Sequence, residues 1–307
     1  MNLPAARRLH GLVAATHTPF HADGSLHLDV VEQQAAHFLN QGILTVFIGG
    51  TTGESSSLTL EERLALAERW LAVAKDSPLR VVVHVGSNCL ADARSLAAQA
   101  EKLGAVAISM LAPSYFKPRS LDILIACCAD VASAAPQTPF YYYDIPSMTG
   151  VSFSMPDFLE KAESRIPTLA GLKFTNPDLM AYQFCLRSYE GRWDVPFGVD
   201  EHLLGALAMG AKGAVGSGFN FAGPLYSRLF SAFKAGDLEA ARKEQFRGIQ
   251  LIDLFSGPGY MAAAKATMEM LGVNVGPPRL PNGSLSPDQT MQLRRDLEGL
   301  GFFDWIN

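Results

Sequence analysis

The sequence predicts an α/β fold: a (β/α)8 TIM barrel followed by a C-terminal helical extension. Eight short β-rich runs, with helix-like stretches between them, occur at residues 11–19, 44–50, 80–86, 105–113, 139–146, 168–175, 195–200 and 213–218. After residue 235 only helical patterns follow. Strict alternation of strand and helix fits a closed barrel better than an open doubly wound sheet. We therefore assign residues 1–235 to the barrel and residues 236–307 to an extension packed on it within one structural domain.

Each element follows from its hydrophobic pattern. Runs such as LTVFIGG and RVVVHVG are apolar throughout, which is typical of strands in a parallel sheet covered by helices on both faces. The stretch between residues 58 and 76 places Leu64, Ala67 and Leu71 along one face, which indicates an amphipathic helix. The same 3.6-residue period predicts the helices of the extension within residues 237–255, 259–272 and 286–301.

Composition narrows the classes of function. The 307 residues are 48% hydrophobic and 18% charged, as in an ordinary globular protein. The net charge is −5 and no Lys/Arg-rich stripe occurs, so the sequence gives no sign of binding to nucleic acid or to an anionic membrane. The four cysteines lack metal-site spacing, so we expect reduced, structural thiols and no metal. No signal-peptide core or membrane-length apolar run occurs. The expected protein is cytoplasmic, with small molecules or copies of itself as partners.

The chemistry of such a barrel lies at the C-terminal ends of its strands. Lys173 lies near the end of the run TLAGLKFT and is the one lysine in a strand run, whereas Lys265 falls in a helix outside the barrel. Burial favours the neutral form of an amine, which can attack a ketone and form a Schiff base. The alternatives are a buried lysine paired with a carboxylate, or a stem along the wall with its ammonium in water.

Two other strand ends carry groups suited to carbonyl chemistry. Tyr143 lies in PFYYYDIP and shares a strand face with Tyr141, so the pair either fills the barrel or supplies a phenol for proton transfer. The turn GGTTGES at residues 49–55 offers many backbone N–H groups but lacks the G-K-S/T of a phosphate loop. We expect Thr51 and Thr52 to bind a carboxylate; a structural turn with capping hydroxyls is the alternative.

The last strand ends carry polar residues of more ambiguous meaning. Asp200 and Glu201 follow the seventh run, where they either begin a helix or accept hydrogen bonds from sugar hydroxyls. Ser217 either joins them or lies in a glycine-flanked turn. His84 has no second metal ligand at a suitable spacing, so we interpret it as a packed histidine.

Taken together, these motifs resemble a known family. The motifs are G-T-T-G-E-S (50–55), Y-x-I-P-x-x-T-G (143–150), G-L-K-F-T (171–175), G-V-D-E (198–201) and G-A-V-G-S (213–217). In their order and spacing, and through nearly its whole length, the chain resembles the N-acetylneuraminate lyase and dihydrodipicolinate synthase superfamily of pyruvate-dependent class I aldolases, and most of all its lyases. The resemblance implies reversible cleavage of N-acetylneuraminate to N-acetylmannosamine and pyruvate, without metal or organic cofactor.

The resemblance also implies residue roles at the reacting end of the substrate. Lys173 forms the imine with pyruvate or the keto sugar acid, and Tyr143 carries the proton for C–C cleavage. Thr51 and Thr52 bind the carboxylate. Tyr115 reaches the site of a neighbouring subunit, in a homotetramer built of two tight dimers.

For the polyhydroxyl tail, the resemblance implies a second group of residues. Asp200, Glu201 and Ser217 hold the hydroxyls, and Thr175 and Gly198 line the same cleft.

Four departures from the family pattern bear on the substrate. Met148 stands where the synthases carry an arginine, and its lack of charge disfavours dihydrodipicolinate synthase activity. Gly218 and Phe219 replace a hydroxyl and a phenol common in lyases, and Asp144 adds a negative charge beside Tyr143. The alternatives are therefore an aldolase or dehydratase for another 2-keto-3-deoxy sugar acid, a dihydrodipicolinate synthase, or a keto-acid binding protein without catalysis.

Overall fold

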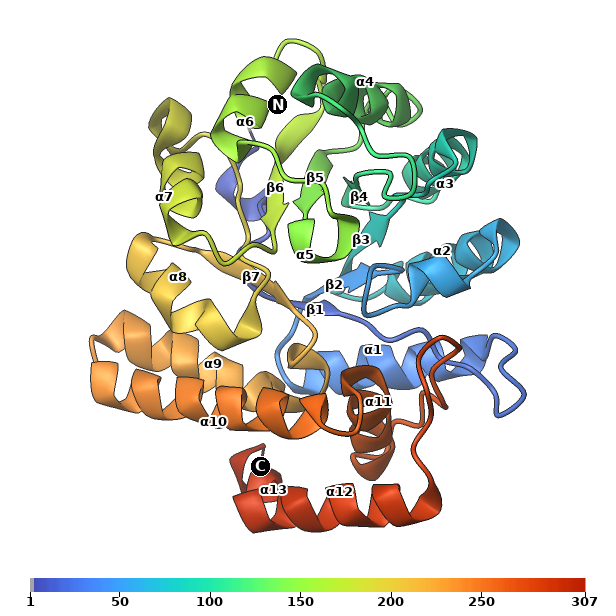
Figure 1. Ribbon diagram of the computed structural model, residues 1–307, viewed down its shortest axis with the longest axis vertical. Helices are drawn as coiled ribbons and strands as arrows, with labels where there is room; N and C mark the ends of the chain where they lie inside the picture. The colour runs from blue at the N-terminus through green and yellow to red at the C-terminus, as the bar shows by residue number, and fades with distance from the viewer. Residues whose placement is uncertain (1–2, 307) are drawn as a thin grey trace.

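Seven parallel strands curl around a common centre in a computed structural model that describes residues 3–306 (Figure 1). Their order in the sheet is β6-β5-β4-β3-β2-β1-β7. The strands are β1 (Gly11–Ala15), β2 (Thr45–Ile48), β3 (Arg80–His84), β4 (Ala107–Leu111), β5 (Phe140–Asp144), β6 (Leu169–Phe174) and β7 (Gly213–Gly216). The predicted (β/α)8 class is confirmed.

The predicted seventh strand, residues 195–200, is wrong as a regular strand. It is an irregular segment in which Phe197 forms isolated bridges to Phe174 of β6 and to Ala214 of β7. Pro196 has no N–H group to donate, so a continuous ladder is interrupted there. The segment still fills the gap between β6 and β7 and closes the barrel, which is why β7 corresponds to the eighth predicted run.

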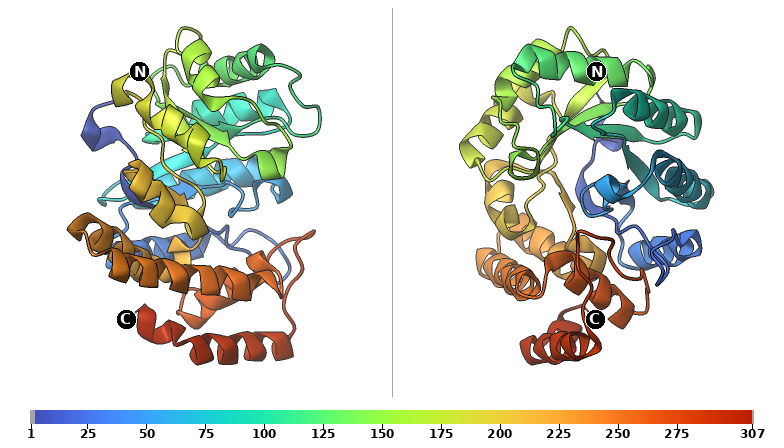
Figure 2. Two further views of the ribbon diagram at one scale, coloured as in Figure 1. Left: turned by 60° about the vertical axis from the view of Figure 1, so that its left-hand side comes forward. Right: turned by 45° about the vertical axis from the view of Figure 1, so that its right-hand side comes forward.

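Helices enclose the strands on the outside, as both views in Figure 2 show. They are α1 (Val31–Asn40), α2 (Leu60–Ala74), α3 (Leu90–Lys102), α4 (Leu121–Ala132), α5 (Pro146–Thr149), α6 (Met155–Ala162), α7 (Leu179–Arg187), α8 (Leu203–Met209) and α9 (Phe219–Ala235). Short 3-10 turns occupy Ala5–Arg7, Leu28–Val30, Ser55–Ser57, Ser188–Gly191 and Asp200–His202. Asp200 and Glu201 therefore do begin a helical turn, which leads into α8.

The C-terminal part is helical, as predicted. It consists of α10 (Leu238–Ser256), α11 (Tyr260–Met270), α12 (Pro287–Leu300) and α13 (Phe302–Trp305). Figure 1 shows α10 alongside α9, with α11 between the first helix of the barrel and α12. The extension thus places α11 near the start of the barrel, where the loops that follow β1 and β2 lie.

Local sequence explains the boundary that matters most for the site. The turn after β2 leads into α2 through a capping box, in which the Glu62 amide donates to Thr59 Oγ1 over 3.2 Å and the Thr59 amide donates to Glu62 Oε2 over 2.9 Å. These bonds satisfy two amides that the first helical turn leaves without partners. The start of α2 is fixed, and with it one end of the GGTTGES turn.

The core has two parts, one between strands and helices and one inside the barrel. Tyr142 belongs to the outer part and packs on Phe158 with ring centroids 4.8 Å apart. Tyr141 and Tyr143 belong to the inner part, as strand alternation predicts. Among residues 3–306, no helix combines the length and apolar character that crossing a membrane requires.

Candidate active site

Lys173 points from β6 into the barrel and is only 4% exposed. Its Nζ lies 3.8 Å from the ring centroid of Tyr143 and 4.1 Å from that of Phe47. Within residues 3–306 it forms no ion pair with a carboxylate, so the alternative of a structural salt bridge finds no support. The amine instead faces two aromatic walls, with its nitrogen available to a ligand.

Tyr143 links this amine to the turn after β2. Its hydroxyl lies 3.3 Å from Thr51 Oγ1, where either group can donate. Its ring meets His84 edge-on, with centroids 6.0 Å apart at an interplanar angle of 90°. The fold therefore brings Lys173, Tyr143 and Thr51 together, although they are separated widely in the sequence.

His84 is a packed histidine, as expected, and it supports the same turn. Burial, assisted by the nearby Arg63 charge, holds the pKa of His84 well below its ordinary value, so the ring is neutral. Because a carbonyl only accepts hydrogen bonds, Nδ1 carries the proton that it shares with Gly49 O over 2.9 Å. The turn is thus hydrogen-bonded to β3 behind Tyr143.

Glycines allow the turn to fold tightly. A Cβ at Gly50 would lie 2.7 Å from the Phe47 ring, and one at Gly53 would lie 3.0 Å from the Gly49 backbone. The Glu54 amide donates to Thr51 O over 3.0 Å, which closes the turn. Thr51 and Thr52 are both half-buried, so their hydroxyls remain available at the surface of this compact support.

The predicted tail-binding residues share one cavity of about 370 Å³ beside this centre. The cavity is lined by Ser147, Thr175, Pro177, Gly198, Val199, Asp200, Glu201, His202, Ser217, Ile252 and Tyr260. All five residues assigned to the tail are among them. The structure therefore has two parts here: the group of Lys173, Tyr143 and Thr51 inside the barrel, and a cavity lined by the residues assigned to the tail.

Asp200 is the most perturbed acid of this cavity. Burial raises its pKa to about 7, and the neighbouring Glu201 charge acts in the same direction. The Gly218 amide donates to Asp200 Oδ2 over 2.7 Å and opposes the rise, as does the charge of Lys173. Asp200 can therefore donate or accept hydrogen bonds near neutral pH, which suits hydroxyl-rich ligands.

Gly198 and Thr175 approach each other closely in the cavity wall. A Cβ at Gly198 would lie 1.9 Å from Thr175 Oγ1. This hydroxyl oxygen is buried and has no hydrogen-bond partner within the described chain. A buried hydroxyl without a partner costs free energy, so a ligand that hydrogen-bonds to it gains accordingly.

Tyr115 does not join the centre within this chain. Its side chain is 79% exposed beyond β4, and its ring packs edge-on against Phe116, which is also exposed. In the described part of the chain it makes no hydrogen bond or ring contact with Lys173 or Tyr143. Its predicted role therefore depends entirely on another subunit.

Sequence reasoning missed two residues that the fold brings to the site. Tyr260 of α11 lines the tail cavity, and its hydroxyl lies 2.7 Å from Ser217 Oγ. Lys265, also on α11, is a second buried lysine and pairs with Glu54 of the GGTTGES turn at 2.8 Å. The helical period alone carried no signal for either contact, because both depend on where α11 packs.

The departures from the family pattern occupy distinct places. Met148 is 64% exposed on α5. Phe219 is fully buried and packs on Tyr226, with ring centroids 4.8 Å apart, so it does not line the tail cavity. Asp144 is buried beside Asn176, which donates to its Oδ2 over 3.1 Å, and burial raises the pKa of Asp144 to about 6.

Comparison with known proteins gives one consistent result. Residues 8–300 match the model of the dihydrodipicolinate synthetase family. The N-acetylneuraminate lyase of Xenopus tropicalis is 42% identical over 281 residues, covering 90% of this chain and 92% of that protein. The human N-acetylneuraminate lyase is 38% identical, with 98% and 95% covered. The structure of Proteus mirabilis N-acetylneuraminate lyase superposes with a TM-score of 0.93 at 39% identity, covering 96% of this chain and 99% of that one.

Proposed function

The chain belongs to the dihydrodipicolinate synthetase family, as its motifs predicted, and on that premise we propose that it is an N-acetylneuraminate lyase, a carbon–carbon lyase that releases pyruvate. The observation that carries the proposal is the Lys173 amine, enclosed in the barrel against Tyr143 and without a carboxylate partner among residues 3–306. Relatives named for this activity align over nine-tenths of the chain or more.

In the proposed reaction Lys173 attacks the keto carbon C2 of the sugar acid, and loss of water gives a protonated imine. The C3–C4 bond then breaks and its electron pair moves into the imine, which leaves an enamine. Tyr143 takes the proton of the C4 hydroxyl, so that N-acetylmannosamine leaves as an aldehyde, and a proton returns to C3. Water hydrolyses the pyruvate imine and frees the Lys173 amine.

Binding of the substrate is divided between the two parts of the site. We assign the carboxylate to the Thr51 and Thr52 hydroxyls and the backbone N–H groups of their turn. The polyhydroxyl tail occupies the cavity of Asp200, Glu201 and Ser217. The protonated imine is the electron sink, so the proposal requires neither a metal nor an organic cofactor.

The test is pyruvate release from N-acetylneuraminate, coupled to lactate dehydrogenase, for the wild type and for Lys173→Ala. We expect the variant to lose at least about a thousandfold in turnover, because covalent catalysis has no substitute nucleophile. Borohydride with pyruvate should add mass to the wild type and to Lys75→Ala, an exposed-lysine control, but not to Lys173→Ala. Full activity in a folded Lys173→Ala protein would refute the mechanism.

A second candidate is an aldolase for another 2-keto-3-deoxy sugar acid. It is favoured by Gly218, which offers no hydroxyl, and by the burial of Phe219 away from the tail cavity. A panel of such acids separates the two, because the substrate whose tail fits gives the highest kcat/KM. Dihydrodipicolinate synthase activity is disfavoured by Met148, which carries no charge. Imine trapping would argue against a keto-acid binding protein without catalysis, although it would not name the acceptor.

The proposal extends to assembly. We propose a homotetramer of two tight dimers in which Tyr115 reaches a neighbouring site. Its support is the exposed aromatic pair of Tyr115 and Phe116, whose side chains are 79% and 87% exposed and would be covered by a partner. The cytoplasmic location expected from the sequence stays a prediction.

A further inference from the structure

Glu54 has an unusual backbone conformation at the end of the carboxylate-binding turn. Its φ of 54° lies in the left-handed region, where a residue other than glycine is strained. Such a conformation persists only where the surroundings fix it. The anchor is the side chain, which is fully buried: Arg279 donates its amide to Glu54 Oε2 over 2.8 Å, and Lys265 Nζ lies 2.8 Å from Glu54 Oε1.

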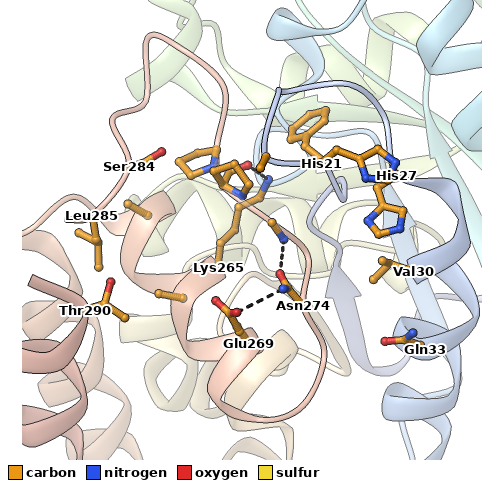
Figure 3. A pocket seen from close by; sticks show the side chains of 17 residues that line it. His21, His27, Val30, Gln33, Lys265, Glu269, Asn274, Ser284, Leu285 and Thr290 are labelled. Carbon is orange, nitrogen blue, oxygen red and sulfur yellow. Dashed lines mark hydrogen bonds between the residues drawn. The ribbon is translucent and has the colours of Figure 1, made fainter. Parts of the chain in front are cut away.

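Lys265 comes from the C-terminal extension, not from the barrel. Its stem rises from α11 along the wall of a cavity, as Figure 3 shows. This cavity has a volume of about 480 Å³ and is also lined by His21, His27 and Asn274. The Lys265 side chain is 1% exposed, so the ammonium is removed from water. A buried charge of this kind requires a full set of partners.

The Lys265 ammonium has three oxygen partners on different segments. It forms an ion pair with Glu54 Oε1 at 2.8 Å and donates hydrogen bonds to Thr18 O over 2.9 Å and to Pro277 O over 3.1 Å. Thr18 in turn donates its hydroxyl to Gly53 O over 2.6 Å. The ammonium therefore joins the loop after β1, the GGTTGES turn and the segment after α11.

These contacts end next to the groups that bind the substrate carboxylate. Gly53 and Glu54 directly follow Thr51 and Thr52, and the Glu54 amide donates to Thr51 O over 3.0 Å. A shift of Glu54 would therefore move the two hydroxyls. Among the contacts of residues 3–306, Glu54 and Lys265 form no hydrogen bond or ion pair with Lys173 or with a residue lining the tail cavity, so the carboxylate site is the part that depends on the ion pair.

We propose that Glu54 and Lys265 are positioning residues through which the C-terminal extension holds the Thr51–Thr52 turn in the geometry that binds the carboxylate of pyruvate. The inference rests on the proposed function, because it takes pyruvate as the ligand of that turn. It assigns to α11 a specific effect on affinity for the keto acid, beyond general support of the fold.

The test is the pyruvate concentration that half-saturates borohydride trapping on Lys173. We expect Glu54→Gln and Lys265→Met to raise this concentration at least about tenfold, since small displacements of binding groups have large effects. Maximal trapping at saturating pyruvate should stay within about twofold of wild type. The double variant should be no worse than the poorer single variant, because the two residues act as one unit.

The control is another largely buried acid, whose ion-pair partners lie on α9 and α10 and not in the turn. Glu244 of α10 is 7% exposed and lies 3.0 Å from Arg228 and 2.7 Å from Arg247. Glu244→Gln should lower thermal stability while leaving the half-saturating pyruvate concentration unchanged. If Lys265→Met does not fold, Glu54→Gln still tests the inference, because the amide keeps the size of the side chain and an oxygen for the Arg279 amide.

The outcomes separate this inference from the proposed function. The positioning role is overturned if folded Glu54→Gln has the same half-saturating pyruvate concentration as the wild type. It is also overturned if only the maximal extent of trapping falls, because a purely structural defect reduces the fraction of active protein and not its affinity for pyruvate. Absence of trapping in the wild type overturns the proposed function, and the present inference with it. Trapping by the wild type without cleavage of N-acetylneuraminate overturns only the choice of sugar acid.

Discussion

Asp200→Asn should change the pH dependence of stability in a defined direction. The folded protein raises the pKa of this buried carboxyl from 3.8 to about 7, mainly through burial. The folded state therefore retains a proton that the unfolded chain releases at lower pH. The contribution of Asp200 to the unfolding free energy is complete below pH 3.8 and is lost as the pH rises through about 7.

The magnitude follows from the size of the shift. Each pKa unit corresponds to about 1.4 kcal/mol, so the full loss is about 4 kcal/mol. Between about pH 5 and about pH 8, about 3 kcal/mol of this is lost. With a urea slope of about 3 kcal/mol per M, the midpoint of the wild type should fall by about 1 M relative to that of Asp200→Asn. Asparagine keeps the size of the side chain and an oxygen for the Gly218 amide.

The assay is urea unfolding of both proteins across this pH range, with the difference between their midpoints as the readout. All other titrating groups are shared, so they largely cancel in that difference. Glu201→Gln is the control: it removes only the secondary electrostatic cause and should keep most of the wild-type pH dependence. A midpoint difference between wild type and Asp200→Asn that is the same at every pH would refute the reasoning.

Two further substitutions test the tail cavity. Tyr260→Phe removes the hydroxyl that lies 2.7 Å from Ser217 Oγ, and the KM for N-acetylneuraminate should rise about three- to tenfold while half-saturation by pyruvate is unchanged. A parallel rise in both would contradict this. Gly198→Ala should lower kcat/KM at least about tenfold because its Cβ would lie 1.9 Å from Thr175 Oγ1. Gly205→Ala, whose Cβ would meet Leu179 at 3.5 Å, is the tolerated control; equal effects of the two alanines would contradict the steric argument.

The barrel could be predicted because its signals are local. Buried parallel strands are apolar throughout, and Tyr143 and Lys173 lie near the ends of two of them, so their convergence follows from the topology alone. The segment at residues 195–200 was predicted as a strand from the same apolar character. Pro196 interrupts its hydrogen bonding, and the bridges of Phe197 to both neighbours became visible only in three dimensions.

The composition of the tail cavity was harder to predict from the sequence. Asp200 and Ser217 could be placed at strand ends, but the Tyr260 hydroxyl reaches Ser217 only because α11 packs over that end of the barrel. A helical repeat determines which face of a helix is apolar, not which loop that helix contacts. Residues contributed by the extension were missed for this reason.

Two buried lysines show how partners, and not burial alone, decide what an amine can do. Lys173 and Lys265 are 4% and 2% exposed. Burial lowers the pKa of Lys265 to about 8, but Glu54 acts against this, and the ammonium has three oxygen partners in the Glu54 carboxylate and the carbonyls of Thr18 and Pro277. Its nitrogen is therefore committed to structure. Lys173 faces two rings and, within residues 3–306, forms no ion pair with a carboxylate, so its nitrogen has no such structural partner. In the proposed function the barrel supplies one lysine for covalent chemistry, and in the inference drawn from Glu54 the extension supplies the other to hold the turn that binds the carboxylate.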